Sequence, residues 1–228
     1  MPSTYRTLTN RLIRQINESE ISQSDFASVK GIHSLCKDAI ADSVDYINHK
    51  KYEWPFNKVA GTKVLSVGTE EYTWPTDFKV ADWESFYIEK DDSLSVSTKR
   101  LRWINRDKWY RSFRESDFNS GSSGLDVPRY VFRLPDGFGV SPSPNKAYTV
   151  NYLYYNNPDR LSAHDDEVTI PVEWDWVIIA GGLWYLNLFR ENPQGTGIIE
   201  SKFKDGVDQM KSLLIDTDEK MEDTRINF

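Results

Sequence analysis

Residues 174–189 read WDWVIIAGGLWYLNLF, and this stretch decides how the rest of the chain is interpreted. Apolar residues fall on nearly every side of the helix that we predict from Pro171 to Arg190, so this helix must be buried, either centrally or between subunits. Its most apolar part, Trp176 to Leu186, spans about eleven residues, whereas crossing a bilayer takes about 20. The sequence therefore predicts a buried helix and no membrane span.

Four residues of this helix are candidates for a subunit interface or a core contact: Trp174, Gly181, Gly182 and Trp184. The two adjacent glycines would allow the backbone of another helix to approach closely. Close approach serves contacts between subunits and packing within one subunit equally well, and both interpretations stay open.

Helical spacing also marks both ends of the chain. Downstream, a helix is predicted over Thr196–Asp216, with an apolar stripe that includes Phe203 and Met210. Upstream, Leu8, Leu12, Ile13 and Ile16 predict a first helix. A longer second helix is expected to begin at Ser22 or Ser24, where a short polar side chain can cap it, and to carry a stripe from Phe26 to Ile47.

Between these helices apolar residues recur at every second position, which is the spacing of a β-strand. Gly, Pro and Asn separate short apolar runs, which predicts an antiparallel sheet or a small sandwich. The expected strands are residues 63–67, 70–74, 80–89, 93–103, 129–133, 139–141 and 147–155.

The predicted fold is therefore α+β, in which N-terminal and C-terminal helices form a helical bundle and the β-rich part is a central insertion. The expected domains are a helical domain of 1–57 plus 171–216, a β-rich domain of 58–170, and a C-terminal arm of 217–228.

Composition limits the function. The 228 residues include 28 Lys and Arg, 35 Asp and Glu, three His and one Cys. One cysteine excludes a disulfide framework and a Cys-based zinc site, and we expect no metal and no cofactor. The net charge of −7 argues against attraction of the whole chain to nucleic acid or to an anionic membrane. The N-terminus lacks the apolar region of a secretory signal, so we expect a soluble protein made in the cytoplasm.

No catalytic motif is present: the sequence has no Walker loop, G-x-S-x-G elbow, H-E-x-x-H or G-x-G-x-x-G after a strand, and we predict that the chain is not an enzyme. His164–Glu167 is the best acid–base or metal candidate, but adjacent residues on an extended chain point apart. We favour a solvated loop there over a cation site. Cys36 is expected to be a buried small residue rather than a nucleophile.

The one strongly basic segment is 99–114, in which aromatic residues such as Trp103 and Trp109 alternate with cations. We favour a strand and a short helix whose aromatic residues enter the core. The alternative is a nucleic-acid-binding module, since bases stack on aromatic rings while phosphates pair with cations. A sugar-binding platform of aromatic residues elsewhere on the surface is a third interpretation. The cations proposed as an interface or nucleic-acid patch are Arg100, Arg102, Arg106, Lys108 and Arg111.

The order of segments resembles that of phage head-to-tail connector (adaptor) proteins of the tail tubular protein A-like family. Glu71–Phe78 (EYTWPTDF) and Leu101–Trp109 resemble two consecutive family motifs. The later matching segments are Val127–Tyr130, Gly139–Pro144, Tyr148–Tyr155, Asp159–Ser162, Asp165–Glu167 and Ile170–Pro171, so the resemblance covers roughly residues 20–215. The chain departs from the family at Val127, where a glycine is usual, and in a Gly/Ser-rich insertion at 119–124.

The resemblance implies a virion structural protein at the head–tail junction, without enzymatic activity. Such proteins form a ring of about twelve copies between the portal protein and the tail nozzle or next tail protein. The family docks onto the portal through its helical part and a C-terminal arm, and its sheet side faces the tail. The arm residues expected to bind the portal are Met221, Arg225, Ile226 and Phe228.

Genomic DNA is expected to pass through such a ring without specific binding. Because walls that repel phosphate ease transit, we expect Asp and Glu to be enriched on the channel side. The basic segment 99–114 would then lie outside the ring or between subunits. The arm is too polar to fold alone, and we expect it to become ordered on the portal.

Overall fold

The computed structural model describes residues 2–50, 52–91, 97–112, 124–191 and 196–215. The chain is mixed α+β and divides into two compact units. The helical unit consists of Met1–Asn57 and Asn157–Phe228, and the β unit, Lys58–Asn156, is inserted into it. Residues 157–170, which we expected in the β-rich domain, thus belong to the helical unit, because Leu161 and Ile170 are buried in its core.

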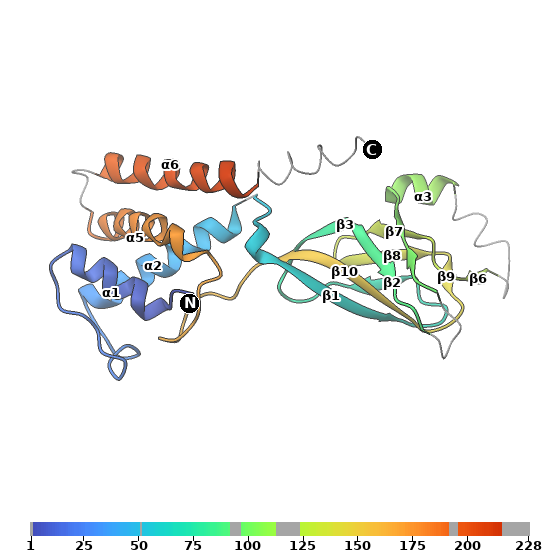
Figure 1. Ribbon diagram of the computed structural model, residues 1–228, viewed down its shortest axis with the longest axis horizontal. Coiled ribbons are helices and arrows are strands. Elements are labelled where there is room, and N and C mark those ends of the chain that lie inside the picture. The colour runs from blue at the N-terminus through green and yellow to red at the C-terminus, as the bar shows by residue number, and fades with distance from the viewer. Residues whose placement is uncertain (1, 51, 92–96, 113–123, 192–195, 216–228) are drawn as a thin grey trace. The chain divides into compact units, whose positions relative to one another are not determined.

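The helical unit contains four described α-helices. They are α1 (Tyr5–Gln15), α2 (Ile32–His49), α5 (Asp175–Phe189) and α6 (Thr196–Leu214), with the 3-10 turns η1 (Pro55–Asn57) and η3 (Val172–Trp174). Helix α5 lies between α2 and α6, and α1 packs on both α2 and α5 (Figure 1). This position explains why α5 is apolar on nearly all sides.

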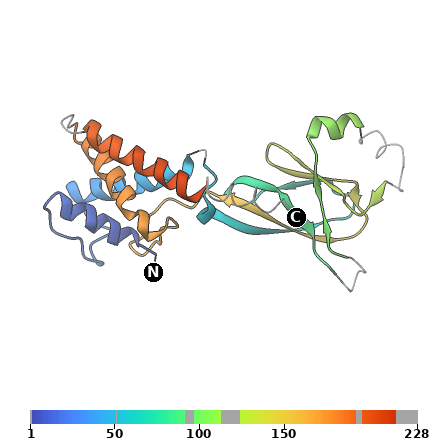
Figure 2. The ribbon, with the colours of Figure 1, turned by 45° about the horizontal axis from the view of Figure 1, so that its top comes forward.

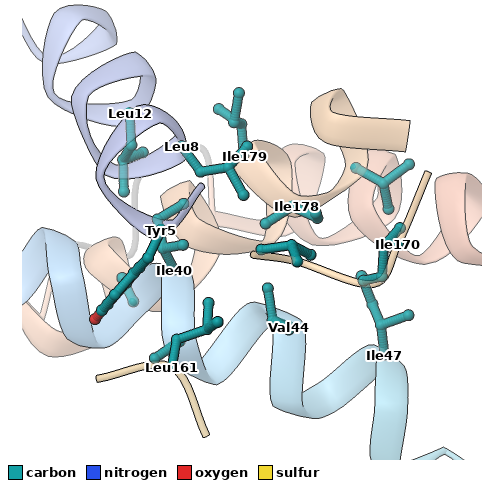
Figure 3. Close-up of a cluster of buried hydrophobic side chains, with 14 of the residues drawn as sticks. Tyr5, Leu8, Leu12, Ile40, Val44, Ile47, Leu161, Ile170, Ile178 and Ile179 are labelled. Carbon is teal, nitrogen blue, oxygen red and sulfur yellow. The ribbon is translucent and has the colours of Figure 1, made fainter. Parts of the chain in front are cut away.

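One hydrophobic core joins these helices (Figure 3). Leu8 and Leu12 of α1 meet Ile40 of α2 and Ile178 of α5, and all four side chains are fully buried. The unit is therefore closed around side chains from both ends of the sequence.

Helix α2 begins at Ile32, about eight residues later than the sequence indicated. Gly31 precedes it with φ +64°, a conformation that glycine adopts readily and that interrupts a helix. Phe26 still enters the core from the preceding turns, where its ring meets that of Tyr5 edge-on with centroids 5.1 Å apart. The burial of Phe26 was thus predicted correctly, but this residue lies in a turn and not in a helix.

The described part of the β unit has three long strands, β1 (Lys58–Leu65), β3 (Phe78–Ile88) and β10 (Tyr148–Asn156), and several short ones. The short strands are β2 (Glu71–Thr73), β4 (Lys99–Arg100), β5 (Arg102–Trp103), β6 (Leu125–Asp126), β7 (Tyr130–Arg133), β8 (Gly137–Ser141) and β9 (Ser143–Pro144). One sheet has the order β1-β10-β3-β4, a second has the order β2-β8-β7-β5, and β6 and β9 form a small pair. Phe86 of β3, Tyr152 of β10 and Phe138 of β8 share one buried aromatic cluster, so the two four-stranded sheets share a core.

Two details differ from the predicted antiparallel arrangement. The pairs β5–β7 and β6–β9 are parallel. The single strand expected over 93–103 is divided into β4 and β5, which belong to different sheets, and Leu101 between them is buried. Residues 92–96 lie outside the described part of the chain. The described β unit also contains helix α3 (Arg106–Ser112), which lies outside the sheets in both views (Figures 1 and 2).

Candidate interaction surfaces

The segment singled out for its charge forms strand β5 and helix α3 at the margin of the second sheet. Arg102 and Trp103 pair with Tyr130 and Val131 of β7, and the Ile104 amide donates to the Val131 carbonyl at 3.0 Å. This pairing fixes the alternation of side chains, so Ile104 is buried while Trp103 is 52% exposed.

Helix α3 follows at once. The Asn105 side chain accepts a hydrogen bond from the Asp107 amide at 2.8 Å, which caps the start of the helix. Trp109 points inward and stacks on Phe132 of β7, with ring centroids 4.3 Å apart. Tyr110, the next residue, is 54% exposed. The expectation that the aromatic residues of this segment enter the core therefore holds for Trp109 and fails for Trp103 and Tyr110. Trp103 lies on strand β5, where alternate side chains face opposite sides of the sheet, and Tyr110 is turned away from its neighbour Trp109 by the helix.

Arg100, within this segment, and Arg129, outside it, have acidic partners, so Arg100 does not share the exposed, unpaired state of the other candidate cations among the described residues. Arg100 pairs with Glu84 and Arg129 pairs with Asp126, each at 2.9 Å. Five other cations are exposed and make no ion pair with any residue in the described ranges. They are Arg102, Arg106, Lys108, Arg111 and Arg133. We call these five residues, together with Trp103 and Tyr110, the basic–aromatic face.

Two neighbouring hollows adjoin this face, with volumes of about 450 and 410 Å³. Arg106, Leu134 and Pro135 line both of them, and Trp103 and Arg133 line the first. The carboxylates of Glu71, Asp107 and Asp136 also line these hollows, so the face combines cations and exposed aromatic rings with shallow hollows of mixed polarity.

The glycine pair of α5 faces inward. A Cβ at Gly181 would lie 2.2 Å from the Ser43 hydroxyl, and a Cβ at Gly182 would lie 2.8 Å from Ile40. Ser43 also donates a hydrogen bond to the Ile178 carbonyl at 2.9 Å. Of the two interpretations left open, the geometry of the glycines matches close packing of α5 on α2 within one subunit.

The tryptophans proposed with these glycines are also engaged within the unit. Trp174 is buried, and its indole nitrogen has no hydrogen-bond partner among the described residues. Trp184 is half-buried and contacts the rings of Tyr46 and Phe203. Neither forms a prominent exposed patch.

Asp175 is a buried carboxylate that sequence reasoning missed. It is 2% exposed and is held by the guanidinium of Arg11 and by the Ser3 hydroxyl, which donates at 2.7 Å. The signal that could have revealed it is an acidic residue at the start of an otherwise apolar helix. This contact ties α1 to α5.

The helical unit has a hollow of its own, of about 440 Å³. Arg11, Arg14, Lys202 and Trp176 line it, but Arg14 pairs with Glu20 at 2.8 Å and Arg11 pairs with Asp175. Most of its positive charge is therefore already neutralised.

The residues considered for acid–base or metal chemistry lie in ordinary structural roles. Asp166 accepts hydrogen bonds from the amides of Ser162 and Ala163, and these bonds lower the pKa of its carboxyl. In the described part of the chain, no three His, Cys, Asp or Glu side chains gather in a metal-binding arrangement. Cys36 is buried, and burial raises the pKa of its thiol to about 11.

Two expected features lie outside the described residues: the arm with Met221, Arg225, Ile226 and Phe228, and most of the insertion at 119–124. The helices within the described ranges include none with the length and apolar character that a bilayer crossing requires.

Comparison with known proteins adds one finding. The sequence model of the SU10 adaptor protein family matches residues 3–226, nearly the whole chain. No curated protein matches the sequence.

Proposed function

The chain belongs to the SU10 adaptor protein family, a family of phage structural proteins, and from this membership we propose that it joins the phage head to the tail within the virion. The match to residues 3–226 carries the proposal, because it includes both the helical unit and the inserted β unit. The proposed role is structural and includes no catalysis.

We propose further that about twelve copies form a ring around the path of the DNA, as in the tail tubular protein A-like adaptors that the sequence resembles. A closed ring of identical subunits requires two different, complementary faces on each copy. The two units differ enough in charge to supply them. The β unit has 14 Lys and Arg against 13 Asp and Glu, a net charge of 14 − 13 = +1, whereas the helical unit has 14 against 22, a net charge of 14 − 22 = −8.

In this proposal the helical unit faces the portal protein and the β unit faces the tail nozzle or the next tail protein. The C-terminal arm, 217–228, supplies apolar anchors at Met221, Ile226 and Phe228 among charged residues, and Arg225 beside them. DNA passes through the ring without specific binding, since the acidic excess repels phosphate.

The oligomeric state tests the proposal. The purified chain is studied by size-exclusion chromatography with light scattering, alone and with the portal protein of the same phage. We expect a complex of defined stoichiometry with portal, whether or not the chain is monomeric alone. A chain that never associates with portal contradicts the proposal.

Deletion of residues 217–228 tests the arm separately. The truncated chain should retain the circular dichroism spectrum and thermal unfolding of the full chain but no longer bind portal. A matched control, Lys220→Ala with Thr224→Ala, leaves all three apolar anchors in place and should bind normally. Normal portal binding by the truncated chain would exclude this role of the arm.

A further inference from the structure

We propose that the basic–aromatic face contacts the acidic helical unit of a second copy of this chain. The inference rests on the proposed ring and identifies one surface of its subunit interface. It goes beyond family membership, because it depends on the side chains that this structure exposes.

The basic–aromatic face carries exposed positive charge. Arg102, Arg106, Lys108, Arg111 and Arg133 are exposed, and none makes an ion pair with another described residue. Arg100 and Arg129 nearby are paired within the unit, so acidic neighbours are present where the fold uses them. Five exposed cations without an ion-pair partner among the described residues, in a chain of net charge −7, indicate a surface that attracts an acidic partner.

The face also exposes two large aromatic side chains. Trp103 and Tyr110 are more than half exposed although they are large and partly apolar. Tryptophan, tyrosine and arginine are the residues that contribute most often to the energetic centre of protein–protein interfaces. The combination therefore favours a protein partner.

The face is hollowed. Arg106, Leu134 and Pro135 line both hollows, so each has an apolar part beside a cation. An apolar side chain of the partner can occupy such a depression while a carboxylate beside it pairs with Arg106 or Arg133.

The helical unit of a second copy has the properties that the face requires of a partner. The helical unit carries a net charge of −8 and exposes apolar side chains next to carboxylates. Val172, which is 47% exposed, precedes the exposed Glu173, and Ile198, which is 79% exposed, lines a hollow together with Asp205. These features complement the basic–aromatic face of a neighbouring copy in charge and in polarity. Contact between two different faces is also what a ring of identical subunits needs.

The platform that presents the face is firmly held. Trp109 stacks on Phe132, and Ile104 is buried and bonded to β7. Because the backbone is already ordered, binding costs little conformational entropy. A modest contact repeated around a ring is therefore enough to hold the subunits together.

Self-association of the full chain tests the inference directly. Proton–nitrogen correlation spectra are recorded between about 20 µM and about 1 mM at low salt, with the Trp103 indole signal assigned from Trp103→Phe. We expect concentration-dependent shifts at Trp103 and on the helical unit, which added salt suppresses. The double variant Arg106→Glu/Arg133→Glu should weaken association by about tenfold or more. The control Lys63→Glu, a half-exposed β1 position away from β5 and α3 in the sequence, should behave as wild type.

Two outcomes overturn the inference: no concentration-dependent shift in wild type, or shifts at the face only when a DNA duplex is added, which would assign the face to nucleic acid. Assembly on portal separates this inference from the proposed function. If wild type forms no portal complex, the proposed function fails. If wild type and Arg106→Glu/Arg133→Glu assemble on portal equally well, the function stands and the assigned surface is wrong.

Discussion

The indole of Trp109 lies flat on the phenyl ring of Phe132, with centroids 4.3 Å apart and planes inclined by 17°. Helix α3 has only seven residues, and a helix of that length is unstable in water by itself. The stack therefore supplies a large part of what holds α3, and with it Arg106 and Arg111, on the sheet.

Replacement of Trp109 by alanine tests this dependence. Trp109 is 5% exposed, so Trp109→Ala should destabilise the β unit by about 3 kcal/mol through lost burial and a cavity. Hydrogen exchange of the β7 and β8 amides measures the change. The neighbour Tyr110, which is 54% exposed, provides the control, and Tyr110→Ala should change stability by less than about 0.5 kcal/mol. Equal losses in the two variants would exclude the anchoring role of the stack.

Gly181 should not tolerate a methyl group. A Cβ there would overlap the Ser43 hydroxyl at 2.2 Å and the Phe203 ring at 2.7 Å, so Gly181→Ala should cost about 1–3 kcal/mol of unfolding free energy. Gly197, at the start of α6, has nothing within 4 Å of the same position. Gly197→Ala should therefore be neutral or stabilise the helix by up to about 1 kcal/mol. Urea unfolding of the helical unit measures both, and a stable Gly181→Ala variant would contradict this packing.

Removal of Arg11 should leave a buried charge without its cation. Asp175 is 2% exposed, and Arg11→Met leaves only Ser3 as its described partner, which should cost about 3 kcal/mol. Arg11→Met/Asp175→Asn removes the charge as well and should recover more than half of that loss. Thermal and urea unfolding of the three proteins measure the effect, and a double variant as unstable as Arg11→Met would refute the interpretation.

Alkaline pH should destabilise the β unit through Tyr154. Burial, together with hydrogen bonds to Asp77 and the charge of that carboxylate, raises the pKa of Tyr154 to about 12. An unfolded tyrosine has a pKa of about 10, so this contribution is complete below pH 10 and is lost as the pH rises from 10 to 12. The expected loss is up to about 2 kcal/mol.

Denaturant unfolding of wild type and Tyr154→Phe between pH 8 and pH 11.5 measures this effect. The variant lacks the ionisable hydroxyl, so its stability should fall less steeply above pH 10. Parallel curves would show that Tyr154 does not contribute.

The spacing of apolar residues along the chain predicted helices and strands well in those segments whose structure depends mainly on which side chains are buried. Most of the apolar stretch at 174–189 is buried because α5 lies between two other helices, as its composition indicated, but Trp176, Leu188 and Phe189 are exposed. The start of α2 was predicted too early, since the turn before Gly31 brings Phe26 to the core by a path that spacing cannot distinguish from a helix.

Pairing between distant segments was beyond such reasoning. The division of 93–103 between two sheets depends on the parallel contact of β5 with β7, some 28 residues further along the chain. For the same reason the sequence located the basic segment but not the exposure of Trp103, and Asp175 was missed because its partner Arg11 is 164 residues away.

The register of β1 with β10 has an evolutionary consequence. Lys58 lies opposite Tyr155, so the inserted unit departs from the helical unit and returns to it at neighbouring positions of one antiparallel pair. A segment whose two ends lie side by side can be replaced by a short linker without changing the path of the rest of the chain. It can also be exchanged for the corresponding segment of a relative.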